Sequence, residues 1–230
     1  KSASGLVGTD GEKMHAAREA GTLLCGKFIG KVMEKALKTG ESNACMKRIV
    51  AAPTAGSCGV VPAVFLTLEE EKHFSEEKMV EALYVAAGIG GVIANRAFLA
   101  GAAGGCQAEI GSASAMAAGG VAYLMGGDAV QISHAAALAL KNLLGLACDP
   151  VAGLVEVPCV KRNVMGAVNA MTSSDMVMAG ITSKIPPDEV IDAMRAIGRS
   201  MSEDIRETGK GGLAGTPTGV AIRERMAGTL

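Results

Sequence analysis

Apolar positions along this chain have the spacing of helices. They recur every three or four residues over long segments, and strand-like alternation is limited to a short possibility at residues 154–157. Thr9 and Glu12 have the spacing of a capping box ahead of the first periodic segment, which closes at Thr39 and Gly40. The pattern therefore predicts one long helix at the start of the chain.

The same spacing predicts six further helices. Pro62 suits the first turn of one helix that ends near Phe74, and Ser75 can cap the next one. The predicted ranges are 62–73, 75–100, 109–126, 129–146, 160–180 and 187–203. We therefore expect an all-α fold.

The composition favours close helix packing. Hydrophobic residues make up 49% of the chain and aromatic residues only 3%, while glycine occurs 31 times. Helices rich in Gly and Ala can approach one another closely, so we expect a single compact helical domain over residues 1–230. Gly-rich breaks at 53–59, 101–105, 149–153 and 209–219 predict loops between helices that could converge on one site.

The charge balance argues against polyanionic partners. The chain has 22 Lys and Arg against 23 Asp and Glu, so neither nucleic acid nor anionic lipid is expected to bind. A mean hydropathy of +0.32 raises the question of a membrane, but the uncharged stretch 110–127 contains five glycines and is too weakly apolar to insert. No signal-like segment precedes the helices, so we expect a cytoplasmic protein, and Lys1 in place of Met indicates a shortened N-terminus.

The cysteines fall into two groups by sequence context. Cys25 and Cys45 lie in segments with helical spacing, where we expect buried structural thiols. Cys106, Cys148 and Cys159 each stand at a break between helices. Such positions leave sulfur free to point at a shared metal, although three unrelated core cysteines would give the same pattern.

Four blocks of sequence carry a more specific signal. They are APTAGSCGVVPA at 52–63, GCQAEIG at 105–111, LGLACDPVAG at 144–153 with VPCVKRN at 157–163, and GGLA at 211–214. In this order they resemble the α chain of the iron-sulfur L-serine dehydratases, or L-serine ammonia-lyases. The resemblance covers essentially the whole chain.

The resemblance implies a lyase that converts L-serine to pyruvate and ammonia without pyridoxal phosphate. It also implies a [4Fe-4S] cluster held by Cys106, Cys148 and Cys159 in the loops between helices. Three thiolates on four irons leave one iron without a protein ligand, and that iron can act as a Lewis acid on the substrate hydroxyl.

The resemblance also suggests where the substrate binds. Thr54, Ser57 and the backbone amides of Ser57, Cys58 and Gly59 precede a predicted helix, where they could bind the substrate carboxylate or simply cap the helix. Glu109 is the candidate catalytic residue, placed to hold the substrate ammonium, with a packing role as the alternative.

The last candidate site residues follow the third cysteine. Arg162 and Asn163 could contact the cluster or the carboxylate, and a surface role is the alternative. His134 is read as a satisfied helix histidine, while His15 and His73 are read as surface residues, so this chain lacks an evident general base.

The absence of an evident general base matches the division of the active site between an α part and a β part that the resemblance implies. The resemblance implies a β chain that closes the site, in a heterodimer or a higher oligomer. Two other classes remain open from the residues alone: an iron-sulfur electron carrier, which needs a complete thiolate set, and a non-catalytic helical interaction domain without iron.

Overall fold

Helices account for the regular structure of residues 1–228, the part of the chain that the computed structural model describes. No strand occurs in this part, so the predicted all-α class is confirmed. The α-helices are α1 (Asp10–Glu19), α2 (Gly26–Ala44), α3 (Val60–Lys72), α4 (Glu76–Arg96), α5 (Gly101–Gly104), α6 (Ser112–Leu124), α7 (Ala129–Lys141), α8 (Cys159–Met178), α9 (Pro187–Ser200) and α10 (Pro217–Ala227). Shorter turns are the π-helix η1 (Gln107–Gly111) and the 3-10 helices η2 (Val151–Gly153), η3 (Glu203–Ile205) and η4 (Gly212–Gly215).

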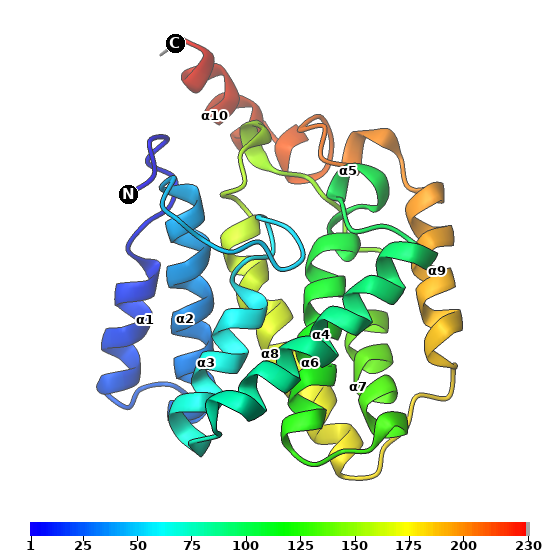
Figure 1. The fold of residues 1–230 in the computed structure, drawn as a ribbon. Coiled ribbons are helices and arrows are strands. Elements are labelled where there is room, and N and C mark those ends of the chain that lie inside the picture. Colours follow the sequence, from blue (N-terminus) through cyan, green and yellow to red (C-terminus); the bar gives the residue numbers. More distant parts are fainter. Residues whose placement is uncertain (229–230) are drawn as a thin grey trace.

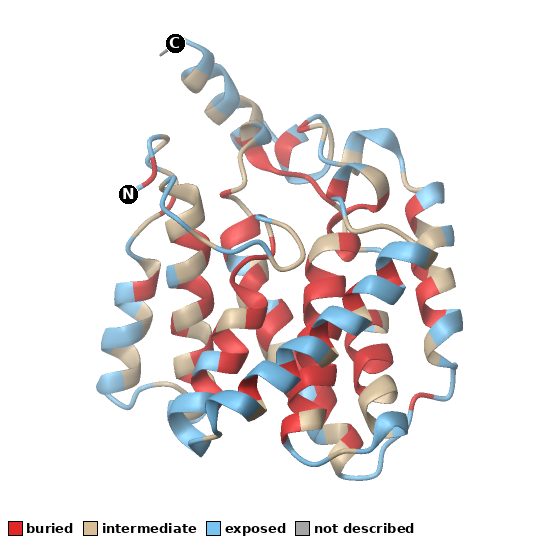
Figure 2. Ribbon diagram, viewed as in Figure 1, coloured by how far each residue is buried: buried red, intermediate tan, exposed pale blue. Residues whose placement is uncertain are grey.

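The uncharged stretch of the sequence forms the centre of the bundle. Helix α6 packs against α3, α4, α7 and α8, and Tyr123 is its only residue that is not buried (Figure 2). A Cβ on Gly120 would lie 2.3 Å from Cζ of Phe65, so the glycine is needed for α3 to approach this closely. No helix among residues 1–228 is long and apolar enough to cross a membrane.

The predicted first helix is wrong in two respects. The chain breaks between α1 and α2, where Gly21 and Gly26 adopt φ angles of +69° and +72°. The capping box predicted for Thr9 and Glu12 is also absent, because Thr9 makes no side-chain cap. The carboxylate of Glu41 accepts hydrogen bonds from the first amides of this segment instead, with distances of 3.0 Å from Thr9, 2.7 Å from Asp10 and 3.2 Å from Gly11.

Other local predictions had mixed outcomes. Ser75 does cap α4, since its Oγ accepts from the amide of Lys78 at 3.2 Å. The expectation of buried thiols inside helices is wrong for Cys25, which is exposed, and Cys45, which is half-buried; the two residues flank α2. The possible strand at 154–157 is absent, and α10 was not predicted.

The loops of the bundle gather at one end. The segments that follow α2, α4, α7 and α9 lie together at the top of Figure 1, beside α5 and the start of α8. Helix α5 packs against α9 and η1, which holds the glycine-rich turn before Cys106 in place. This end of the bundle contains all four sequence blocks described above.

Candidate active site

Cys106, Cys148 and Cys159 are buried near one another at the loop end, where the charges of Cys106 and Cys159 act on Cys148. Their exposed fractions are 3%, 4% and 9%. Burial raises the pKa of Cys106 to about 11 and that of Cys159 to about 12. It also raises the pKa of Cys148, which the charges of the other two cysteines raise further. The structure thus brings the three sequence-predicted thiols within electrostatic reach of one another.

Arg162 places a positive charge beside this group. Its guanidinium counteracts burial by lowering the pKa of Cys106 and Cys159. Its Nη1 donates to the carbonyl of Ala147 at 2.6 Å, and its Nη2 forms a 2.9 Å ion pair with Asp149. Arg162 therefore ties the loop of Cys148 to α8, the helix that begins with Cys159.

Asn163 joins α8 to the loop that precedes α3. Its Oδ1 accepts from the amide of Gly59 at 2.8 Å, and its Nδ2 donates to the carbonyls of Gly56 at 2.8 Å and Cys159 at 3.0 Å. The side chain is buried and its polar atoms are engaged within the protein. These contacts give Asn163 a positioning role, and a direct contact between Asn163 or Arg162 and substrate stays a prediction.

The loop at residues 53–59 leads directly into α3, as the sequence predicted. Oγ of the buried Ser57 lies 3.0 Å from Oγ1 of Thr54, and Thr54 lies close enough to Glu109 to lower the pKa of that carboxyl group. Cys58 is buried with Sγ 3.9 Å from the carbonyl oxygen of Thr39 in α2, and burial raises its pKa to about 11. Thr54 is therefore the member of this loop that links it to the cysteine site.

Glu109 lies between this loop and the cysteines. Its Oε2 is 3.9 Å from Sγ of Cys148, and a Cβ on Gly56 would lie 3.1 Å from its Oε1. Burial raises the pKa of Glu109, and the charge of Glu207 adds to this rise, while the hydrogen bond from Thr54 opposes it. The carboxyl group is thus placed among polar groups but has no cation beside it within the described part of the chain.

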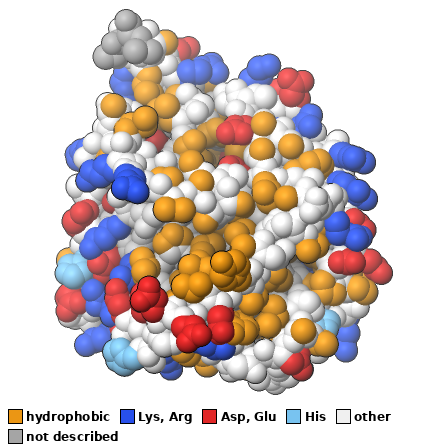
Figure 3. Space-filling view, in the orientation of Figure 1, with side chains coloured by type: hydrophobic (Ala, Val, Ile, Leu, Met, Phe, Trp, Pro, Cys, Tyr) orange, Lys and Arg blue, Asp and Glu red, His pale blue; other side chains and the backbone are white. Residues whose placement is uncertain are grey.

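Glu207 is a second carboxylate at this site, and sequence reasoning missed it. Its amide donates to the carbonyl of Cys148 at 2.7 Å. A Cβ on Gly101 would lie 2.8 Å from both Sγ of Cys148 and Oε2 of Glu109, and 3.3 Å from Oε2 of Glu207. The available signal was an acidic residue just ahead of the last Gly-rich break. In Figure 3 the surface is hollowed near the loop end of the bundle, where acidic side chains are visible.

The three histidines lie in other surroundings. His134 accepts a hydrogen bond at Nδ1 from the amide of Ser183 at 3.2 Å, which agrees with its reading as a satisfied helix histidine. His15 pairs with Glu34, and His73 ends α3. None of them has a described contact with the cysteine site.

The donor set has the chemistry of an iron-sulfur site, because cysteine thiolates are the ligands that such clusters take. The three cysteines are buried, and the charge of Arg162 favours the thiolate forms of Cys106 and Cys159. Among residues 1–228, no group of three or more His, Cys, Asp or Glu side chains is placed to hold a metal ion as the side chains stand.

Comparison with known proteins gives a consistent match. Residues 1–214 match the model of a family described as serine dehydratase alpha chain. The chain is 53% identical to a probable L-serine dehydratase alpha chain of Bacillus subtilis, over 99% of this chain and 76% of that protein. It is 49% identical to the L-serine dehydratase alpha chain of Peptoniphilus asaccharolyticus, over 89% and 70%. An L-serine dehydratase of Escherichia coli is 41% identical over 78% of this chain but only 40% of its own length.

Proposed function

Because the chain belongs to the serine dehydratase alpha chain family, we propose that it is the α subunit of an L-serine ammonia-lyase. The reaction is the β-elimination of water from L-serine, followed by conversion of the aminoacrylate to pyruvate and ammonia. One observation carries this proposal: the three cysteines are buried near one another, and the carboxyl group of Glu109 lies 3.9 Å from the sulfur of Cys148 and beside Thr54 of the loop before α3.

Cys106, Cys148 and Cys159 are the residues that would hold a [4Fe-4S] cluster. When bound, such a cluster supplies a Lewis-acidic iron for the departing hydroxyl group. Arg162 supports this role in two ways, because its charge favours the thiolate forms of Cys106 and Cys159 and its hydrogen bond fixes the loop of Cys148.

The loop before α3 supplies groups suited to a carboxylate. Thr54 and Ser57 carry hydroxyls, and the amide of Ser57 lies near the positive end of α3. The amides of Cys58 and Gly59 donate within the protein, to the carbonyl of Ala55 at 3.3 Å and to Oδ1 of Asn163 at 2.8 Å. Ser57 is buried against Thr54, and Thr54 is the residue of this loop that lowers the pKa of the half-buried Glu109. We assign the substrate carboxylate to this loop and the substrate ammonium to Glu109.

The general base is assigned to the partner chain. None of the three histidines has a described contact with the site, and the relatives of which this chain spans 76% and 70% carry the name alpha chain. The longer Escherichia coli relative, of which this chain spans 40%, has room for a second part in the same polypeptide. The active enzyme is therefore proposed to contain this α chain and a β chain.

Anaerobic reconstitution with iron and sulfide, followed by an L-serine assay with and without the β chain, tests this proposal. We expect pyruvate formation by the complex. The isolated chain should be slower by roughly the 10²- to 10⁴-fold that a positioned base contributes. Full activity of the isolated chain would place the base within it and make His134 the first residue to mutate. No turnover by a complex with a loaded cluster would contradict the assigned reaction.

A further inference from the structure

Glu207 has a backbone conformation that its side chain does not favour. Its φ of +66° lies in the left-handed region, which non-glycine residues seldom adopt. Hydrogen bonds on both sides of Cys148 maintain it: the amide of Cys148 donates to the carbonyl of Ile205 at 2.9 Å, and the amide of Glu207 donates to the carbonyl of Cys148 at 2.7 Å. The segment is therefore fixed to the loop of a predicted cluster ligand.

With this backbone conformation, the Glu207 carboxylate lies beside Gly101 and near the carboxylate of Glu109. Oε2 of Glu207 and Oε2 of Glu109 lie within 3.3 Å of the position that a Cβ on Gly101 would occupy. The two oxygens are therefore separated by no more than twice that distance. Glu207 is exposed and Glu109 is half-buried, so the pair reaches from the rim of the site inward.

The pair carries negative charge without an internal counter-ion. Within the described residues, no lysine or arginine forms an ion pair with either carboxylate; the nearby Arg162 is paired with Asp149. Two carboxylates this close repel each other, and a cation between them removes the repulsion. A group with one positive charge and several N–H donors satisfies both oxygens at once.

We infer that Glu207 is a specificity residue that, together with Glu109, binds the α-ammonium group of the substrate. The inference rests on the proposed function and extends it to a residue outside the four sequence blocks. L-Serine has one cationic group, its α-ammonium, whereas its carboxylate is assigned to the loop before α3. The carboxylate pair thereby distinguishes α-amino acids from hydroxy acids of the same size.

Glu207→Gln in the reconstituted complex with the β chain tests this inference. The substitution keeps the size and backbone preference of the side chain and removes its charge. Loss of a hydrogen bond to a charged group predicts a KM for L-serine that rises roughly 10-fold or more. Inhibition by L-alanine, which carries the ammonium, should weaken equally, whereas inhibition by L-lactate, which carries a hydroxyl there, should be unchanged.

Two controls separate this role from a structural one. Glu203→Gln removes an exposed carboxylate four residues away and should leave KM unchanged. The iron content and visible absorbance of Glu207→Gln should equal those of the parent complex, because the backbone hydrogen bonds to Cys148 are retained.

The outcomes are distinguishable. If the parent complex turns over L-serine and Glu207→Gln has the same KM, this inference alone is wrong. An equal loss of inhibition by L-alanine and by L-lactate would also overturn the inference, because Glu207 would then affect the shape of the site and not the recognition of the ammonium charge. A parent complex without L-serine turnover would contradict the proposed function, and this inference with it.

Discussion

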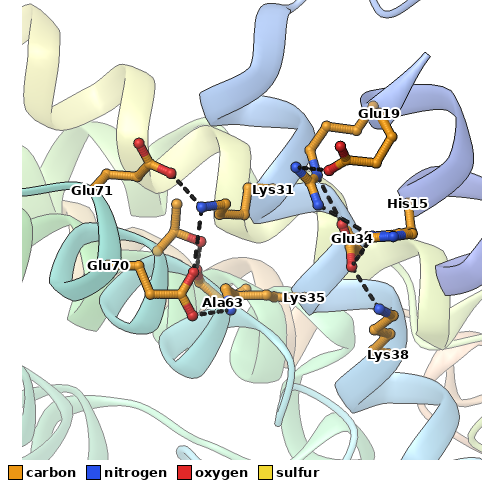
Figure 4. Close-up of polar contacts among 11 residues, drawn as sticks. His15, Glu19, Lys31, Glu34, Lys35, Lys38, Ala63, Glu70 and Glu71 are labelled. Atoms are coloured by element: carbon orange, nitrogen blue, oxygen red, sulfur yellow. Dashed lines mark hydrogen bonds and ion pairs between the residues drawn. The ribbon is translucent and has the colours of Figure 1, made fainter. Parts of the chain in front are cut away.

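Two carboxylates in this molecule, Glu34 and Glu109, show how neighbouring side chains raise or lower the pKa of an acid that is partly or fully buried. Glu34 lies in α2, where Figure 4 shows it between Lys38 and His15, and it also pairs with Arg18. Burial favours the neutral form of Glu34, but hydrogen bonds from Lys38 at 2.5 Å and Arg18 at 2.9 Å outweigh burial and hold its pKa below the usual value. Glu109 has no such cation, and its pKa is raised.

The difference separates a structural group from a functional one. The cations around Glu34 come from α1 and α2, so the interaction is complete within the fold, and pairs of Lys31 and Lys35 with acids of α3 extend it (Figure 4). At Glu109 the fold supplies a threonine, a cysteine and a second carboxylate. A carboxyl group left without a cation in this way is suited to a ligand that brings one.

The largest effect is expected where the cysteine site is broken. Changing Cys106, Cys148 or Cys159 to Ser should abolish L-serine turnover and the broad cluster absorbance of the reconstituted protein. Cys25→Ser is the matched control, because Cys25 is exposed at the start of α2 and should leave both signals intact. Full iron content in all three single variants would remove the ligand assignment. The Glu34 network should be unaffected throughout.

The comparison itself is tested by the same substitution at both carboxylates. Glu34→Gln removes the carboxylate that pairs with Lys38 and Arg18, of which Arg18 keeps its ion pair with Glu19, and should lower the free energy of unfolding by about 1 to 3 kcal/mol. Glu109→Gln removes a carboxylate that burial disfavours, so stability should stay within about 1 kcal/mol of the parent or rise. Urea unfolding of the two variants measures this difference. Equal destabilisation by both would show that the neighbours of Glu109 also serve the fold.

A smaller effect is expected in the pH dependence of stability. The pKa of Glu34 is lowered from 4.5 on folding, so its contribution is present above that value and is lost as the pH falls through the lower folded pKa. The stability difference between the parent and Glu34→Gln should therefore be constant near neutral pH and shrink below about pH 4.5. A difference that is the same at acidic pH would mean that the charge of Glu34 is not what stabilises the fold.

An exposed ion pair should matter less. Glu70→Gln, which removes the exposed pair with Lys35, should shift the free energy of unfolding by only about 0.5 kcal/mol.

Sequence reasoning succeeded where the signal was local or carried by a block of residues. Helical spacing predicted α3, α4, α6, α7, α8 and α9, and chain breaks separated Cys106, Cys148 and Cys159 from the thiols that flank α2. The family resemblance, carried by the four blocks, is confirmed by the family match over residues 1–214.

The failures involve contacts between distant residues. Glu41 caps the start of α1 from about thirty positions away, which no capping-box spacing could reveal. Glu207 acquires its positive φ through hydrogen bonds to the loop of Cys148. Arg162 and Asn163 lie beside the cysteine loops, but their partners are the Asp149 carboxylate and backbone groups that only the fold brings near. Tertiary hydrogen bonds therefore account for most of what remained hidden.

The smallest expected effect concerns the strain at Glu207. Glycine adopts a φ of +66° without steric cost, so Glu207→Gly removes a folded-state penalty of roughly 1 kcal/mol or more. It also makes the unfolded chain more flexible, which costs about 0.4 to 1 kcal/mol. The two terms nearly cancel, and we expect urea unfolding to show a change between zero and a gain of about 1 kcal/mol.

The control is the same change at the exposed Glu203, which has no strain to relieve and should be destabilising. If Glu207→Gly unfolds more easily than the parent by more than Glu203→Gly does, the side chain supports the fold. A gain in stability together with weaker L-serine binding would mean that the strained backbone at Glu207 serves to position its carboxylate for substrate. Glu34 differs, because its charge stabilises the folded protein.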